Sequence, residues 1–132
     1  MRRNGARWNP QGTPMVHAAG SLALARLEVL VHLPRESLLA GYRGPELAFN
    51  RRWVHWPRPA NLPADWSASP VPVAVQRRGT AWSNRRGSMI LQVPSAVVPS
   101  ESNFLLNPSH PRFQKIEVLG THPCHFNPRL AE

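Results

Sequence analysis

Proline most constrains what this chain can fold into. The 132 residues include 15 prolines and 8 glycines, and the chain shows no long regular segment and no internal repeat. Because proline lacks a backbone N–H and fixes φ, it ends helices and is excluded from the middle of strands. The sequence therefore predicts a loop-rich domain built from short elements, with low helix content.

The clearest helix signal lies in the stretch SLALARLEVLVHL, residues 21–33. Ser21 is a suitable N-cap, the Leu and Ala residues have high helix propensity, and Pro34 limits continuation past the stretch. The helix is apolar on nearly every side, which predicts that it is buried. One carboxylate, Glu28, interrupts the apolar run. Because an unpartnered carboxylate is costly to bury, Glu28 either faces solvent or has a function.

Short strands are predicted on both sides of this helix in the sequence. The apolar run in SMILQVP predicts a central strand that ends at Pro94. Residues 14–20 predict a strand that enters the helix, and residues 113–120 predict another from their near alternation of apolar and polar side chains.

Two further segments complete the predicted fold. Residues 35–63 are irregular apart from a possible strand in RRWVHWP, and residues 72–84 predict a second helix, because Val75, Gly79 and Trp82 fall near helical spacing. The fold class is therefore α+β, with a mixed core of short strands, one buried helix and few others.

Composition limits the class of protein. The chain has no run of roughly 18 apolar residues and no apolar segment behind its basic N-terminus, which predicts no membrane span, no secretory signal and a cytoplasmic location. The single cysteine, Cys124, excludes an internal disulfide, and its neighbours His122 and His125 match no zinc spacing, so no metal is expected.

The charge balance predicts an anionic partner. The formal net charge is +9, and 15 of the 16 cationic residues are arginine, with Lys115 the exception. Nucleic acid, a phosphate-bearing small molecule and an acidic protein would all satisfy this charge. Direct nucleic-acid binding is disfavoured, because the Arg pairs are widely separated and no nucleic-acid motif is present.

A set of polar residues has no explanation in local structure: Arg7, His17, Glu28, His32 and Ser95. Glu28 and His32 are four residues apart and share one helix face, so both can point into one cleft. The alternative is structural: Glu28 pairs with a distant arginine, His32 is favoured by the helix dipole, and Ser95 is a turn residue. The residues alone leave both interpretations open.

Several blocks of sequence, taken in order, resemble the RES domain, the toxin half of a bacterial toxin–antitoxin family named for its Arg, Glu and Ser. The blocks, between Arg7 and Leu130, are RWNPQGTPMVHAAGSLALARLEVLVHLP, LPADW, GTAWS, LQVPSAVVPSESNFLLNPSHPRF and FNPRL. The resemblance implies a single RES domain over residues 1–132 with an ADP-ribosyltransferase-like fold.

The resemblance also implies a function. Family members consume NAD by breaking the bond between nicotinamide and ribose, through hydrolysis or phosphorolysis, and some are described as modifying a protein instead. It implies a type II toxin that acts as an NAD glycohydrolase or NAD phosphorylase, with an Xre-type antitoxin as partner and no cofactor beyond NAD as substrate.

Carried over by position, the family's arginine, glutamate and serine fall on Arg7, Glu28 and Ser95, and His17 stands where the family usually has tyrosine. Arg7 is then expected to hold the pyrophosphate, Glu28 to stabilise the ribosyl cation, and Ser95 to contact the ribose or the nicotinamide amide. His17 is expected to stack on the ligand or donate a hydrogen bond to it, and His32 to line the same pocket beside Glu28.

Two departures from the family pattern support a second hypothesis. Tyrosine is replaced by His17, and only residues 1–6 precede the arginine block, where relatives have an additional segment. An apparently shortened domain of this kind predicts a catalytically impaired binding module that retains contact with NAD or with an antitoxin.

Overall fold

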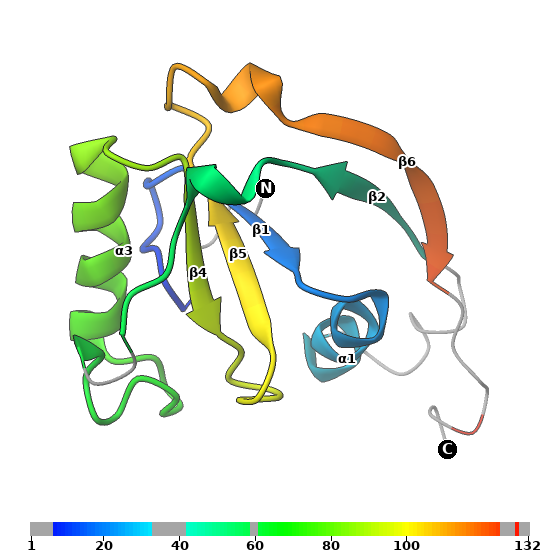
Figure 1. Cartoon of the computed structure of the whole chain (residues 1–132). Coiled ribbons are helices and arrows are strands. Elements are labelled where there is room, and N and C mark those ends of the chain that lie inside the picture. Colours follow the sequence, from blue (N-terminus) through cyan, green and yellow to red (C-terminus); the bar gives the residue numbers. More distant parts are fainter. Residues whose placement is uncertain (1–6, 33–41, 59–60, 125–128, 130–132) are drawn as a thin grey trace.

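The computed structural model describes residues 7–32, 42–58, 61–124 and 129. The strands in these ranges are β1 (Val16–Ala19), β2 (Tyr42–Ala48), β3 (Val54–His55), β4 (Ile90–Pro94), β5 (Ser102–Leu106) and β6 (Glu117–Cys124). The α-helices are α1 (Leu22–His32) and α3 (Val73–Arg85), and the 3-10 helices are η1 (Arg51–Trp53) and η3 (Phe113–Lys115). This mixed architecture confirms the predicted α+β class (Figure 1).

The main sheet has four strands in the order β1-β5-β4-β3. β5 is antiparallel to both of its neighbours, whereas the short β3 runs parallel to β4. β2 and β6 form a separate antiparallel ribbon, which arches beside the sheet in Figure 1. β4 is therefore an interior strand, as its apolar run predicts.

Strand alternation divides the apolar residues into two clusters. On the α3 side, Leu91 of β4 and Leu105 of β5 join a buried cluster that includes Trp8, Val75 and Trp82. Their sequence neighbours point to the other face, because successive side chains of a strand alternate. The second buried cluster consists of Met89, Ile90 and Leu106, with Phe49 and Phe104 among the side chains packed against it.

Helix α1 begins as predicted but is not buried. The Ser21 hydroxyl accepts a hydrogen bond from the Leu24 amide at 3.1 Å, which is the predicted N-cap. Leu24 is fully buried, whereas Leu27 and Val31 are 40% and 60% exposed. The helix follows β1 at one edge of the sheet in Figure 1, so only part of its surface has sheet to pack against. The prediction of a buried helix was wrong, because apolar composition does not supply a second layer to cover the outer face.

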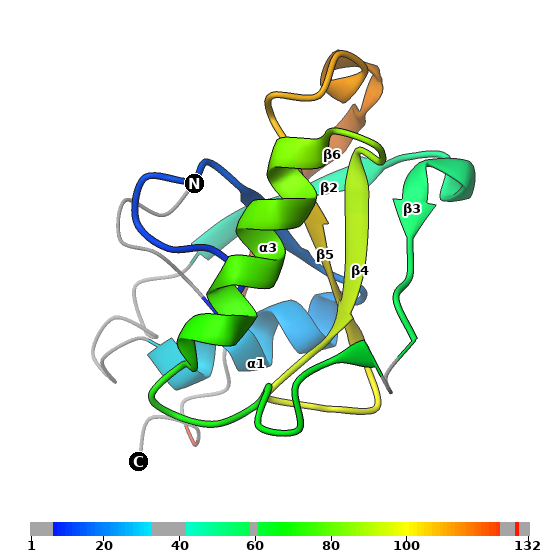
Figure 2. The ribbon, with the colours of Figure 1, turned by 90° about the vertical axis from the view of Figure 1, so that its left-hand side faces the viewer.

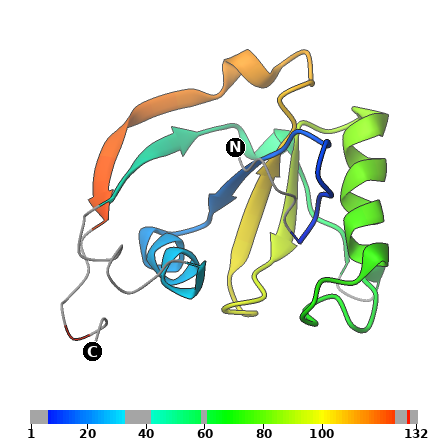
Figure 3. The ribbon, with the colours of Figure 1, turned by 180° about the vertical axis from the view of Figure 1, so that it is seen from behind.

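Helix α3 agrees with its prediction. It covers one face of the sheet in Figure 2, and Val75, Gly79 and Trp82 are the buried positions that helical spacing indicated. The segment before β1 runs alongside α3 (Figure 3). At this contact a Cβ on Gly79 would lie 1.5 Å from the Trp8 carbonyl oxygen.

The other differences concern strands. β2 lies inside the stretch predicted to be irregular, and β5 carries no prediction. The expected strand over 113–120 begins only at Glu117, because residues 113–115 form η3, and the strand in RRWVHWP is reduced to β3. Among the helices in the described ranges, none is long and apolar enough to cross a membrane.

The contact between Gly79 and Trp8 gives a test of the fold. We expect Gly79→Ala to reduce the free energy of unfolding by about 3 kcal/mol, because the added methyl overlaps a backbone carbonyl that cannot rotate away. Urea denaturation measures the loss. The control is Gly87→Ala, where nothing lies within 4 Å of the new methyl, with an expected change below about 0.5 kcal/mol. Equal stability of the two variants would contradict the packing described.

Candidate functional site

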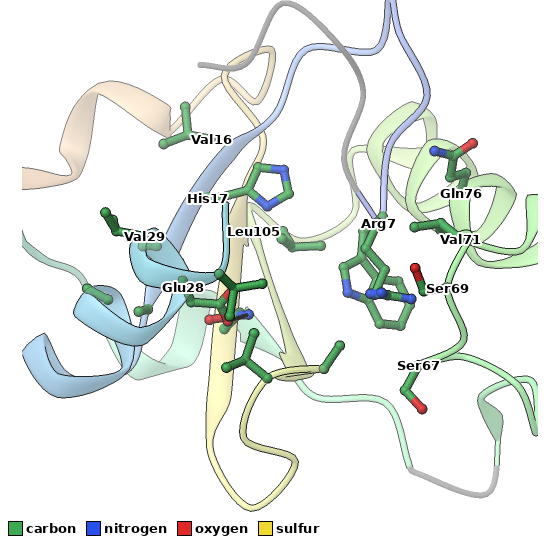
Figure 4. Close-up of a pocket in the computed structure, with 18 residues that line it drawn as sticks. Arg7, Val16, His17, Glu28, Val29, Ser67, Ser69, Val71, Gln76 and Leu105 are labelled. Atoms are coloured by element: carbon green, nitrogen blue, oxygen red, sulfur yellow. Dashed lines mark hydrogen bonds between the residues drawn. The ribbon is translucent and has the colours of Figure 1, made fainter. Parts of the chain in front are cut away.

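A cavity of about 810 Å³ opens between α1, β1 and the segment that leads into α3. Figure 4 shows Glu28 and His17 on one side of this cavity and Arg7, Ser67 and Ser69 on the other, with Leu105 between them. The volume is typical of small-molecule sites. We call this space the main pocket.

The carboxylate of Glu28 is held by two neutral donors. Its Oε1 atom accepts hydrogen bonds from the Ser95 hydroxyl at 2.8 Å and from the Asn103 side-chain amide at 2.9 Å. Among the residues that the structure describes, no arginine pairs with Glu28. Glu28 is half-buried and lines the main pocket. Among the described residues, Oε2 has no hydrogen-bond partner.

Ser95 is completely buried at the end of β4. Its hydroxyl donates a hydrogen bond to Glu28 and accepts hydrogen bonds from the backbone amides of Val97 and Val98, both at 3.1 Å. A serine hydroxyl has one donor and two lone pairs, so these three bonds use its full capacity. Ser95 is therefore a turn residue, as one interpretation expected, and its bond to Glu28 connects it to the main pocket, as the other interpretation requires. Its place is behind Glu28, which differs from the expected direct contact with ribose or nicotinamide.

Arg7 is held by backbone carbonyls. Its Nη1 atom donates to the carbonyl oxygens of Trp66 at 3.0 Å and Ala68 at 2.8 Å. The neighbouring Trp8 ring stacks on Trp66, with centroids 6.4 Å apart. Both bonds use one nitrogen, so the rest of the guanidinium remains available on the wall of the main pocket.

His17 lies on β1 opposite Leu105 in the sheet register, which directs it toward the main pocket. Its Nε2 atom lies 3.0 Å from Oδ1 of Asn9, a buried residue whose amide nitrogen donates to the Thr13 carbonyl at 2.9 Å. Because that bond assigns Oδ1 as the acceptor, His17 Nε2 is the donor. Asn9 therefore orients the imidazole.

His32 and the histidines around Cys124 cannot be placed in or near the main pocket from the described residues. His32 is the last residue of α1, and its side chain lies outside the described residues, as do those of His122, Cys124 and His125. Over the residues that are described, no group of three His, Cys, Asp or Glu side chains is placed to hold a metal ion.

Sequence reasoning missed the two asparagines that orient the site, Asn9 and Asn103. The signal for Asn103 was available only indirectly: it is two residues before Leu105, so it shares that residue's face of β5. Because β5 was not predicted, the face on which Asn103 lies could not be assigned from the sequence. Asn9 lies just before Pro10, between two turns, where asparagine is common and has no distinguishing pattern.

The structure is a mixed α/β protein whose main pocket has one carboxylate, Glu28, and one arginine, Arg7, on opposite walls. A family model described as the RES domain matches residues 1–127. The chain therefore belongs to the RES domain family. The sheet and helix arrangement is consistent with the ADP-ribosyltransferase-like fold that the resemblance implies.

Curated relatives cover nearly the whole chain. A protein of Yersinia enterocolitica named Toxin Res is 36% identical over 128 residues, covering 96% of this chain and 84% of the relative. A protein of a Sphingobium species named Prs ADP-ribosylating toxin is 35% identical over 131 residues, with 96% and 80% covered. A Toxin Res of Photorhabdus laumondii is 38% identical over 112 residues, with 84% and 71% covered.

The three bonds of Ser95 predict a large effect of removing its hydroxyl. We expect Ser95→Ala to lower the free energy of unfolding by about 2–3 kcal/mol, because two partly buried amides and the Glu28 carboxylate lose a partner. Chemical denaturation checks the value. The matched control is Ser100→Ala on the same turn, where the serine is exposed and the expected change is below about 0.5 kcal/mol. A Ser95→Ala variant as stable as the control would refute the hydrogen-bond arrangement.

Proposed function

We propose that this chain is the toxin of a bacterial type II toxin–antitoxin system and depletes NAD by cleaving the nicotinamide–ribose bond. The observation that carries the proposal is the state of Glu28 in the main pocket. One carboxylate oxygen is bound to Ser95 and Asn103, and the other has no partner among the described residues. Membership of the RES family, with relatives named as toxins, supports the same function.

The chemistry needs a fixed negative charge near the ribose. When the C–N glycosidic bond breaks, its electron pair goes to the pyridine nitrogen, nicotinamide leaves as a neutral molecule, and positive charge develops on the ribosyl ring. Water then adds to the anomeric carbon and releases a proton, giving ADP-ribose. A carboxylate held before the reaction stabilises this charge without reorganising. Glu28 is the residue proposed for this role, and its open Oε2 can also accept from a ribose hydroxyl.

Ser95 and Asn103 act on this step through Glu28. Both donate to Oε1, so the carboxylate is oriented from two directions. They are positioning residues in this proposal.

Arg7 and His17 are proposed to bind the rest of NAD. Arg7 lines the main pocket across from Glu28, and its remaining donors suit the pyrophosphate. His17, which replaces the family's usual tyrosine, lies on the same side of the main pocket as Glu28, which suits contact with the ribose or the nicotinamide. In this proposal NAD spans the main pocket, with its pyrophosphate at Arg7 and its nicotinamide at the α1 end beside Glu28.

The acceptor of the ADP-ribosyl group defines a second candidate function. The Sphingobium relative is named an ADP-ribosylating toxin, which favours transfer to a protein side chain. In that reaction a protein nucleophile replaces water at the anomeric carbon and loses its proton. Inorganic phosphate as acceptor would give NAD phosphorylase activity.

The antitoxin is the proposed protein partner, and an Xre-type protein is the kind the family resemblance implies. A net charge of +9 favours an acidic contact face on such a protein. Covering the main pocket would block access of NAD to Glu28.

Glu28→Gln tests the catalytic proposal. The amide oxygen can still accept from Ser95 and Asn103, but the negative charge is lost, so we expect nicotinamide release from NAD to fall by about 10²-fold or more. Chromatography of nicotinamide with and without phosphate gives the rate and identifies the acceptor. Glu117→Gln, at an exposed position of β6, is the control and should retain the parent rate. No release by the parent, or equal release by Glu28→Gln, would contradict the proposal.

His17→Tyr distinguishes a weakened enzyme from a pure binding module. Tyrosine restores the family's usual residue and offers a larger ring for stacking, so we expect the rate of NAD cleavage to rise by about tenfold. The same nicotinamide assay measures the gain. A lower rate in the variant would show that this chain needs the hydrogen bond between Asn9 and His17 for NAD cleavage. No activity in either the parent or the variant would favour the binding module.

A further inference from the structure

A second, smaller cavity lies between α3 and the β3 side of the sheet. Its volume is about 220 Å³, and its lining includes the buried side chains Trp82, Leu91 and Val93. This volume is below the range of about 300–1,000 Å³ that small-molecule sites occupy. The cavity therefore suits one inserted side chain, and its apolar wall favours an apolar one.

Two arginines and a histidine lie around this cavity. Arg78 and Arg85 of α3 and His55 of β3 line it, and all three residues are exposed. The two arginines are seven residues apart, which places them on the same side of α3 about 10 Å from each other along the axis. Among the described residues, none of those that line the cavity is acidic.

The surrounding surface has the same sign of charge. Helix α3 contains no acidic residue, and no carboxylate within the described ranges pairs with Arg78 or Arg85. Further exposed arginines lie on α3, at its C-cap, on η1 and after β3: Arg51, Arg52, Arg58, Arg77 and Arg86. Figure 2 shows α3 and β3 on the same side of the molecule. A surface of this kind attracts a partner that carries several negative charges.

We propose that this cavity and its arginines dock an acidic peptide segment of a protein partner, with one apolar side chain inserted against Trp82 and Leu91. The inserted side chain would be the buried anchor, and carboxylates on either side of it would pair with Arg78 and Arg85. This surface is separate from the main pocket, although Trp8 lines both cavities.

Nucleic acid fits these observations less well. Trp82 is 4% exposed, and its indole N–H donates to the Ser88 hydroxyl at 2.8 Å, so only a small part of the ring borders the cavity, which is too little for a base to stack on. Trp56 is 58% exposed but does not line the cavity. An apolar recess between arginines is instead the geometry of a peptide anchor site.

The test uses the purified full chain and a fluorescent peptide with one Phe flanked on each side by Glu residues. Fluorescence anisotropy at low ionic strength measures its affinity, and NAD is absent, so the result does not depend on the proposed enzyme activity. We expect the peptide to bind about tenfold more tightly than a version with Ser in place of Phe. Arg78→Glu with Arg85→Glu should weaken binding by about tenfold or more.

Two further variants distinguish binding at the cavity from a general effect of net charge on peptide affinity. Arg112→Glu with Lys115→Glu makes the same change of net charge at exposed positions outside the cavity and should alter affinity by less than about twofold. Ala81→Phe fills the cavity from an exposed position of α3 and should remove the preference for Phe over Ser while the charges remain. Circular dichroism verifies that each variant is folded.

Three outcomes would overturn the proposal. The first is an equal loss of peptide affinity in the two charge-reversal variants, and the second is equal affinity for the Phe and Ser peptides. The third is that oligothymidylate binds more tightly than the peptide and that this binding is lost in Arg78→Glu/Arg85→Glu. The last outcome would assign the surface to single-stranded nucleic acid.

Discussion

The candidate site depends on the hydrogen bonds made by the Glu28 carboxylate. They connect α1 to Ser95 at the end of β4 and to Asn103 on β5, positions 67 and 75 residues away in the chain. The Ser95 Oγ atom also accepts hydrogen bonds from two backbone amides of the turn after β4. The same oxygen atom therefore binds both this turn and the Glu28 carboxylate. A second connection, from Ser21 to Glu101 at 3.0 Å, ties the start of α1 to the same turn. A helix that is exposed on its outer face is thereby held in place by polar contacts as well as by Leu24.

The opposite wall of the main pocket depends on close packing of backbone. Gly79 lets α3 approach the Trp8 carbonyl, and Trp66 stacks on the Trp8 ring. Arg7 precedes Trp8 and donates to the carbonyls of Trp66 and Ala68, so the same contact that packs α3 also determines where the guanidinium lies. One wall is therefore organised by hydrogen bonds to a carboxylate and the other by packing around an indole, and a ligand that spans the main pocket would contact both.

Local signals predicted some elements well. Ser21 caps α1, Val75, Gly79 and Trp82 form the buried face of α3, and the apolar run of β4 lies inside the sheet. β2 and β5 were not predicted, because Pro45 and Gly44 weaken the pattern of one, and only five residues form the other. Their stability comes from pairing with β6 and with β1 and β4, which sequence neighbours do not reveal.

By itself, the sequence determined the mixed fold class, the N-cap of α1, the buried face of α3, the membership of the RES family and the identity of Glu28 and Arg7 as residues of interest. Those features depend on local propensity or on the order of residues along the chain. Only the tertiary structure decided that Ser95 lies behind Glu28, that Asn103 is its second donor and that α1 is half exposed. These facts arise from contacts between segments distant in sequence, and a hydrogen bond of about 3 Å needs a relative placement that periodicity and propensity do not encode.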